Sequence, residues 1–282
     1  MTTAFGDRLA SAFDAKGRLC LGIDPHAHLL LSWGLPDSAD GARQFGLRAV
    51  DAVSGTVGIV KPQVAFFERF GSAGYAALED VLAAARTAHL LVIADVKRGE
   101  IGSSMRGYAS AWLTPGSPLE ADAVTLNPYL GVAALNETFD VARQNGKGAF
   151  VLAATSNPEA ATLQQSTTSS GTTVANDVVS WISTWNADNA AEQLGDIGIV
   201  AGATLELSTF GIDTNTAFDP ILPVLAPGFG FQGARVGDAS RIYGQLSPGV
   251  IVSESRSILS AGPDDIARVA LQRATEVRES FV

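Results

Sequence analysis

The stretch LLVIADVKRGE, residues 90–100, joins a five-residue apolar run to a charged segment that contains Asp95, Lys97 and Glu100. A short apolar run bounded by polar residues is typical of a buried β-strand. Charges of both signs at the end of such a strand cost desolvation free energy unless they neutralise one another, so a cluster there often serves a substrate. The simpler alternative is a solvated strand end with a chance ion pair, and the surrounding sequence must decide between the two.

The composition is that of an ordinary globular protein. The 282 residues are 46% hydrophobic and 17% charged, which is enough for one large domain or two small ones. The formal net charge of −10 argues against a nucleic-acid partner, because no basic stripe is available to bind a phosphate backbone. A small anionic ligand would therefore need a local cationic pocket.

Cysteine usage and hydropathy point to one cellular compartment. Cys20 is the single cysteine and lies in the apolar run at residues 19–21, which predicts a buried, reduced side chain and excludes an intrachain disulfide. The first residues contain no long apolar segment, and no stretch reaches the roughly 18 apolar residues of a membrane span. We therefore expect a cytoplasmic protein without a membrane partner.

Short apolar runs alternate with longer amphipathic stretches along the whole chain. Runs such as residues 197–201 are apolar on both faces, as expected for parallel strands that helices cover. The predicted strands are residues 19–24, 57–61, 90–95, 122–126, 149–153, 197–201, 221–225 and 249–253. Eight such units predict an α/β fold in which residues 1–282 form a single (β/α)8 TIM barrel.

Three segments outside the strands complete this prediction. Residues 5–15 are expected to form a helix that caps the N-terminal end of the barrel. Residues 174–185 carry an apolar stripe with helical spacing, and we interpret this stripe, together with Trp181, as core. Residues 164–173 are almost entirely Gln, Ser, Thr and Gly, which predicts a polar loop within one domain.

In a barrel of this kind, catalytic groups gather at the C-terminal ends of the strands. The predicted strand ends are unusually polar, and each alone could be ordinary turn chemistry. They are Asp24-Pro25-His26, Lys61-Pro62-Gln63, Asp95 with Lys97, Asn127-Pro128-Tyr129, Thr155-Ser156-Asn157-Pro158, the glycine-rich residues 227–233, and Ser253-Glu254-Ser255-Arg256. Their collection on one rim favours a functional site.

Lys61 ends the strand that precedes residues 90–95, so the two strand ends should be neighbours. Lys61, Asp95 and Lys97 could then form an alternating line of charges, in which each charge keeps its neighbour ionised. Such a line would fix the position of a lysine that donates a proton. A purely structural ion-pair network is the alternative.

The strand ends at residues 227–233 and at Arg256 predict an anion site. Gly228, Gly230 and Gly233 surround Gln232, and the N–H groups of such a loop, with the Arg256 guanidinium, can hold a phosphate. The loops after strands 7 and 8 commonly bind phosphate in barrels.

Other common site chemistries have little support in the sequence. His26 and His28 have the H-x-H spacing of metal ligands, but no carboxylate or cysteine cluster completes a ligand set, so we expect surface or loop histidines and no metal. No nucleophilic triad, Walker loop or Rossmann fingerprint is present.

Several motifs together resemble the orotidine 5'-phosphate decarboxylase family, in particular its longer bacterial branch in actinobacteria. They span almost the whole chain in order, and this makes the resemblance more specific than any single motif. The motifs are Leu21-Gly22-Ile23-Asp24-Pro25-His26, residues 61–67 (KPQVAFF), residues 95–99 (DVKRG), residues 127–131 (NPYLG), residues 153–159 (AATSNPE) and residues 227–233 (PGFGFQG).

This resemblance implies a carboxy-lyase that converts orotidine 5'-monophosphate to uridine 5'-monophosphate and CO2 in pyrimidine biosynthesis, without a metal or organic cofactor. It implies that Lys97 protonates C6, that Asp95 lies beside the departing carboxylate and holds Lys97, and that Lys61 pairs with Asp95. Glu100 completes the implied catalytic set. The implied substrate-binding residues are Asp24 at the ribose, Ser156 at the pyrimidine, Gly230, Gln232 and Arg256 at the phosphate, and in addition Ser104 and Asn127.

The resemblance also implies a homodimer in which Glu100 and Ser104 reach into the partner's active site. Both positions depart from the expected pattern, which has Asp and Thr there. A glutamate is one methylene longer, and a misplacement of about 1 Å can cost on the order of a hundredfold in rate. We therefore expect the fold and phosphate site of the family, with catalytic efficiency the open question.

Two other functions are compatible with the sequence. A sugar-phosphate lyase or aldolase of the same wider superfamily shares an acid-x-Lys motif on strand 3 but commonly uses a magnesium ion, and Lys61 stands where such an enzyme favours an acidic ligand. A catalytically impaired nucleotide-binding homologue would explain Glu100.

Overall fold

Eight parallel strands close into a barrel in the computed structural model, which describes residues 2–189 and 193–281. Each strand pairs with its successor, and the last pairs with the first through Cys20 and Ser253. The strands are β1 (Leu19–Ile23), β2 (Ile59–Pro62), β3 (Leu91–Arg98), β4 (Ala123–Leu126), β5 (Gly148–Ala154), β6 (Ile197–Ala201), β7 (Val224–Pro227) and β8 (Val250–Glu254). The predicted TIM barrel is confirmed.

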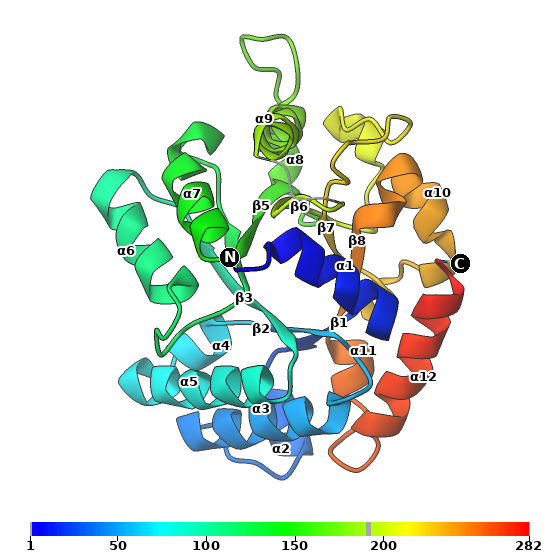
Figure 1. The fold of residues 1–282 in the computed structure, drawn as a ribbon. Coiled ribbons are helices and arrows are strands. Elements are labelled where there is room, and N and C mark those ends of the chain that lie inside the picture. Colours follow the sequence, from blue (N-terminus) through cyan, green and yellow to red (C-terminus); the bar gives the residue numbers. More distant parts are fainter. Residues whose placement is uncertain (1, 190–192, 282) are drawn as a thin grey trace.

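Helices surround the barrel (Figure 1). They are α1 (Phe5–Lys16), α2 (Ala27–Ser32), α3 (Ala39–Val53), α4 (Ala65–Glu68), α5 (Gly71–Thr87), α6 (Gly102–Leu113), α7 (Asn136–Gln144), α8 (Ala160–Gln164), α9 (Val174–Asp188), α10 (Ala239–Tyr243), α11 (Arg256–Leu259) and α12 (Ile266–Glu279). A short 3-10 helix at Leu207–Phe210 lies between β6 and β7. Among the described helices, none is long and apolar enough to cross a bilayer.

Two strand boundaries differ from the sequence prediction in an informative way. β7 begins at Val224 rather than at residue 221, because Pro220 and Pro223 have no N–H to donate to a sheet. β3 continues to Arg98, beyond the predicted end at residue 95. The charged residues Asp95 and Lys97 therefore belong to the strand itself, and the barrel fixes their backbone.

Helix α1 closes the N-terminal end of the barrel, as predicted. Figure 1 shows it lying across the strands, apart from the surrounding helices. Phe5 and Leu9 are fully buried in one cluster with Cys20 and Phe150, and the Phe5 and Phe150 rings meet edge to face with centroids 6.0 Å apart. The prediction that Cys20 is buried and unpaired is also confirmed.

The predictions for the segment around α9 are confirmed in part. Val178 and Ile182 are buried, and Trp185 packs against the core. The assignment of Trp181 to the core is wrong, because its side chain is 41% exposed and its Nε1 donates a hydrogen bond to Asn136 Oδ1 (3.0 Å). The preceding polar segment is a loop that begins after α8, with a bridge between Thr167 and Thr173.

A buried ion network joins α1 to β3, β4 and β5 at the N-terminal end. Asp122 Oδ1 accepts from Arg8 Nη1 (2.7 Å) and from Lys147 Nζ (3.5 Å), and Asp122 Oδ2 accepts from the Val92 N–H (2.9 Å). Lys147 also pairs with Glu120 (2.7 Å). The network lies at the end of the barrel opposite the C-terminal strand ends, so we assign it to stability.

We predict that Asp122→Ala lowers the free energy of unfolding by about 3–5 kcal/mol, because the buried Val92 N–H and Arg8 Nη1 lose their acceptor and Lys147 loses one of its two carboxylate partners. Urea unfolding of the variant measures this. The matched control is Asp80→Ala, which removes an exposed ion pair with Arg43 and should cost far less. Equal losses of unfolding free energy in the two variants would contradict the assignment of this network to stability. So would a loss of activity in Asp122→Ala that is still folded.

Candidate active site

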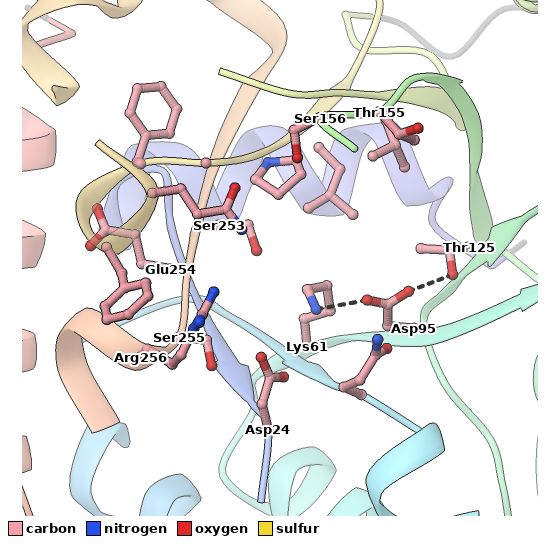
Figure 2. A pocket seen from close by; sticks show the side chains of 18 of the residues that line it. Asp24, Lys61, Asp95, Thr125, Thr155, Ser156, Ser253, Glu254, Ser255 and Arg256 are labelled. Carbon is pink, nitrogen blue, oxygen red and sulfur yellow. Dashed lines mark hydrogen bonds and ion pairs between the residues drawn. The ribbon is translucent and has the colours of Figure 1, made fainter. Parts of the chain in front are cut away.

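A cavity of about 320 Å³ opens at the C-terminal ends of the strands, and most of the predicted site residues line it (Figure 2). Those that line it are Asp24, Lys61, Asp95, Lys97, Ser156, Gln232 and Arg256. They come from strand ends that are far apart in the sequence, and barrel closure brings them together. The proposed gathering of polar strand ends on one rim is thus present in the structure.

Asp95 lies at the centre of the charged wall of this cavity. Its Oδ2 accepts from Lys61 Nζ (2.9 Å), and its Oδ1 accepts from Lys97 Nζ (2.5 Å) and from Thr125 Oγ1 (2.9 Å). The Asp95 and Lys61 side chains are only 9% and 10% exposed, whereas the Lys97 side chain is 44% exposed. Lys61 is therefore enclosed next to the carboxylate, whereas the Lys97 side chain is far more open to the cavity.

The pair of Asp95 and Lys61 stays ionised. Burial alone would raise the pKa of the Asp95 carboxyl, but the positive charges of Lys61 and Lys97 outweigh burial and hold it well below its usual range. Burial alone would likewise lower the pKa of Lys61, and the charges of Asp95 and Asp24 raise it above its ordinary value instead. The site presents a fixed anion flanked by cations.

The backbone at Lys97 is held in an uncommon conformation. Its φ is +45°, in the left-handed region, and the β3–β4 register shifts between Ala94 and Arg98. The Lys97 N–H donates to Thr125 Oγ1 (2.9 Å). A non-glycine residue in this region carries strain that the surrounding structure must stabilise, and such residues cluster at functional sites.

Two buried oxygen atoms of this cavity wall have no partner within the described chain. They are Asp24 Oδ1, after β1, and Ser255 Oγ, after β8. A buried polar atom without a hydrogen bond costs free energy, so Asp24 Oδ1 is suited to accept from a ligand hydroxyl and Ser255 Oγ to donate to a ligand oxygen. Figure 2 shows both side chains near Lys61 and Arg256.

The glycine-rich loop after β7 meets the start of α11. Gly230 has φ +67°, and a Cβ there would lie 2.6 Å from Glu254 Oε2, so a glycine is required at this position. The fully buried Glu254 carboxylate is neutralised by Arg273 (2.6 Å) and accepts from Ser257 Oγ (2.6 Å). Because Arg273 neutralises Glu254, Arg256 is available to bind the anion that the sequence predicts at this loop.

The Arg256 guanidinium stacks on the Phe231 ring, 4.0 Å from its centroid. Gln232 and Gly228 line the same end of the cavity. Ser156 and the apolar side chains of Leu152, Val200 and Leu225 also line the cavity. The cavity thus combines the Arg256 cation, a wall of charged residues and apolar lining, which suits a phosphorylated nucleoside.

Residues 17–270 match the family model described as "Orotidine 5'-phosphate decarboxylase / HUMPS family". The chain belongs to this family. The resemblance inferred from the motifs is confirmed.

Curated relatives and solved structures agree over the full length. Orotidine 5'-phosphate decarboxylase of Corynebacterium glutamicum is 48% identical over 265 residues, which are 92% of each chain, and that of Salinispora arenicola is 49% identical over 96% of this chain and 95% of the relative. The crystal structure from Streptomyces avermitilis assigned to the same activity has a TM-score of 0.93 and 43% identity, covering 100% of this chain and 97% of its own.

Four predicted site residues of this decarboxylase-family chain are not among those that line the cavity. One of them, Gly230, lies in the glycine-rich loop after β7, and the other three are Glu100, Ser104 and Asn127. Glu100 is turned toward its own backbone, where Oε1 accepts from the Ile101 N–H (2.9 Å), and Ser104 is exposed on α6. Asn127 Oδ1 accepts from the Tyr129 N–H (3.0 Å). The Asn127 carbonyl also approaches Gly99 so closely that a Cβ there would lie 2.2 Å from it.

The structure adds two residues to which sequence reasoning gave no role of their own, although Gln63 was among the polar strand ends. Thr125 and Gln63 both contact the charged wall. A hydroxyl inside the apolar run at residues 123–126 was the available signal for Thr125. Of the described residues, no group of three or more His, Cys, Asp or Glu side chains could hold a metal ion, so the magnesium-dependent lyase alternative has no ligand set there.

Proposed function

We propose that this chain converts orotidine 5'-monophosphate to uridine 5'-monophosphate and CO2, with Lys97 as the proton donor to C6. The decarboxylase activity follows from the full-length similarity to curated orotidine 5'-phosphate decarboxylases. The observation that supports the role of Lys97 is its ion pair with the buried Asp95, in a cavity that Arg256 and Gln232 also line.

The cavity orients the substrate from its two ends. Arg256 and Gln232, with the loop at residues 228–233, would bind the phosphate, and Asp24 would accept hydrogen bonds from the ribose hydroxyls. Ser156 would read the polar edge of the pyrimidine. C6 and its carboxylate would then lie at the wall formed by Asp95 and Lys97, and binding energy from the distant phosphate could lower the chemical barrier.

The chemical step needs only groups that this wall supplies. The bond from C6 to the carboxylate carbon breaks, its electron pair stays on C6, and CO2 departs. The Lys97 ammonium stabilises the developing negative charge and transfers a proton to C6, which forms the C6–H bond of the product. The resulting neutral amine regains a proton from solvent, and no oxidant or reductant is required.

We propose further that the chain is a homodimer with shared active sites. Ile101, Tyr129 and Leu130 are 60%, 74% and 50% exposed, and they follow Gly99 and Asn127, whose backbones are in contact. Large apolar side chains exposed on neighbouring segments support a protein interface. Glu100 directly precedes Ile101 and Ser104 follows it by three residues, which supports a role for both in the partner's site. We place the enzyme in the cytoplasm, consistent with a single unpaired cysteine.

The direct test of the proposed reaction is the loss of substrate absorbance with wild type and Lys97→Ala. We expect robust turnover in wild type and a fall in kcat of at least about 10⁴-fold in the variant, since both proton transfer and charge stabilisation are removed. The variant should bind uridine monophosphate with comparable affinity. Lys16→Ala, at the opposite end of the barrel, is the control, and near wild-type turnover in Lys97→Ala would refute the proposal.

A subunit-mixing experiment tests whether Glu100 acts across the dimer. Lys97→Ala and Glu100→Ala should each be weakly active alone. An equal mixture that exchanges subunits should recover about a quarter of wild-type activity, because half of the dimers are mixed and each of these has one intact site. No recovery despite subunit exchange would place Glu100 within its own subunit's site. Wild-type activity of Glu100→Ala alone would remove it from the machinery.

A further inference from the structure

Gln63 lies between the two residues on which the proposed chemistry depends, and neither the sequence motifs nor the reaction scheme assigns it a role. It follows β2 directly, is partly buried and lines the active-site cavity. Its backbone is fixed on two sides, because its N–H donates to the Ile23 carbonyl (3.1 Å) and it forms a parallel bridge with Asp95. The side chain therefore leaves the backbone at a defined position.

The amide orientation that satisfies both ends of the Gln63 side chain joins Asp95 to Lys97. In it, Nε2 donates to Asp95 Oδ2 (2.8 Å) and to the Asp95 carbonyl (2.9 Å), and Oε1 accepts from Lys97 Nζ (3.2 Å). The opposite orientation would turn the amide oxygen toward two acceptors. Hydrogen bonding thus assigns the orientation.

With Gln63 in place, the Asp95 carboxylate is saturated. Oδ1 accepts from Lys97 and Thr125, and Oδ2 accepts from Lys61 and Gln63. A carboxylate has about four acceptor positions, so all four are occupied. The donors are held by β2, by β3, by β4 and by Gln63 directly after β2. Rotation of the carboxylate would break at least two of these bonds.

Lys97 is the least restrained member of this group. Its side chain is 44% exposed, and lysine has many rotamers. Asp95 attracts its ammonium but does not fix the direction from which it approaches. Gln63 Oε1 supplies a second acceptor for the same ammonium, and two acceptors with fixed positions restrict its location.

We propose that Gln63 is a positioning residue, which holds the Lys97 ammonium against Asp95 by bridging the two side chains with its carboxamide. Gln63 does not take part in bond making. Its contribution is to keep the proton donor within reach of C6, where a displacement of about 1 Å can cost on the order of a hundredfold in rate. The inference rests on the proposed role of Lys97.

Two variants of Gln63 test this role, and both keep the length of the side chain. Gln63→Met removes both hydrogen-bonding ends. We expect kcat to fall by roughly 10- to 100-fold, while KM and the affinity for uridine monophosphate stay within about threefold of wild type. Gln44→Met, on the exposed face of α3, is the matched control and should behave as wild type.

Gln63→Glu should make kcat depend on pH in a way that would not occur if Gln63 only filled space. The new carboxylate would face Asp95 Oδ2 where the amide nitrogen donates, so like charges would repel and kcat near neutral pH should fall below that of Gln63→Met. The charged groups that line this region are Lys61, Asp95, Lys97 and Asp24. As pH falls, the added carboxyl takes up a proton, can donate to Asp95 again, and kcat should recover relative to wild type.

Wild-type kcat in Gln63→Met would overturn the inference. So would a loss of affinity for uridine monophosphate that accounts for the loss of activity, because Gln63 would then be a ligand contact. A higher kcat for Gln63→Glu than for Gln63→Met at neutral pH would also contradict the inference. If the inference alone fails, Lys97→Ala still abolishes turnover, whereas an inactive wild type would mean that the proposed function has failed.

Discussion

One buried carboxylate, Asp95, determines how the active site of this barrel is built. Taking a carboxylate out of water costs several kcal/mol, and the cost is offset only by charges and hydrogen bonds with good geometry. Lys61 and Lys97 supply the charges, and Thr125 supplies a further donor from the neighbouring strand. The same contacts that stabilise the anion fix the two lysines, so stability and catalytic geometry come from one set of interactions.

The closed barrel makes this arrangement possible. β2, β3 and β4 are neighbours in the sheet, so Lys61, Asp95 and Thr125 lie close together although they are far apart in the sequence. The register shift in β3 and the left-handed backbone at Lys97 then turn that residue toward the cavity. At the other end of the barrel, charges such as Asp122 and Lys147 join elements together and line no substrate cavity. Two buried ion clusters in one fold thus serve stability and chemistry separately.

The sequence was sufficient for the barrel and for the main charged line, because both depend on local patterns. Apolar runs specify parallel strands, and a lysine and an aspartate at the ends of consecutive strands must be neighbours in such a sheet. Contacts that depend on side-chain direction could not be predicted in this way. The hydroxyl of Thr125, the carboxamide of Gln63 and the exposure of Trp181 follow from packing between elements. The place of Glu100 depends on a second subunit, which one chain's pattern cannot specify.

The active site depends on Asp95 remaining ionised, and the carbon-13 shift of its carboxyl group across a pH titration measures this directly. A folded-state pKa below the unfolded value of about 3.9 means that the ionised group stabilises the fold above that pH and loses this contribution as the pH falls. We predict the shift of an ionised carboxylate from about pH 8 down to about pH 4, and a higher midpoint in Lys61→Met, which removes one flanking charge. A midpoint above about pH 5 in the wild-type protein would show that the two lysines do not hold the charge, and would contradict the account.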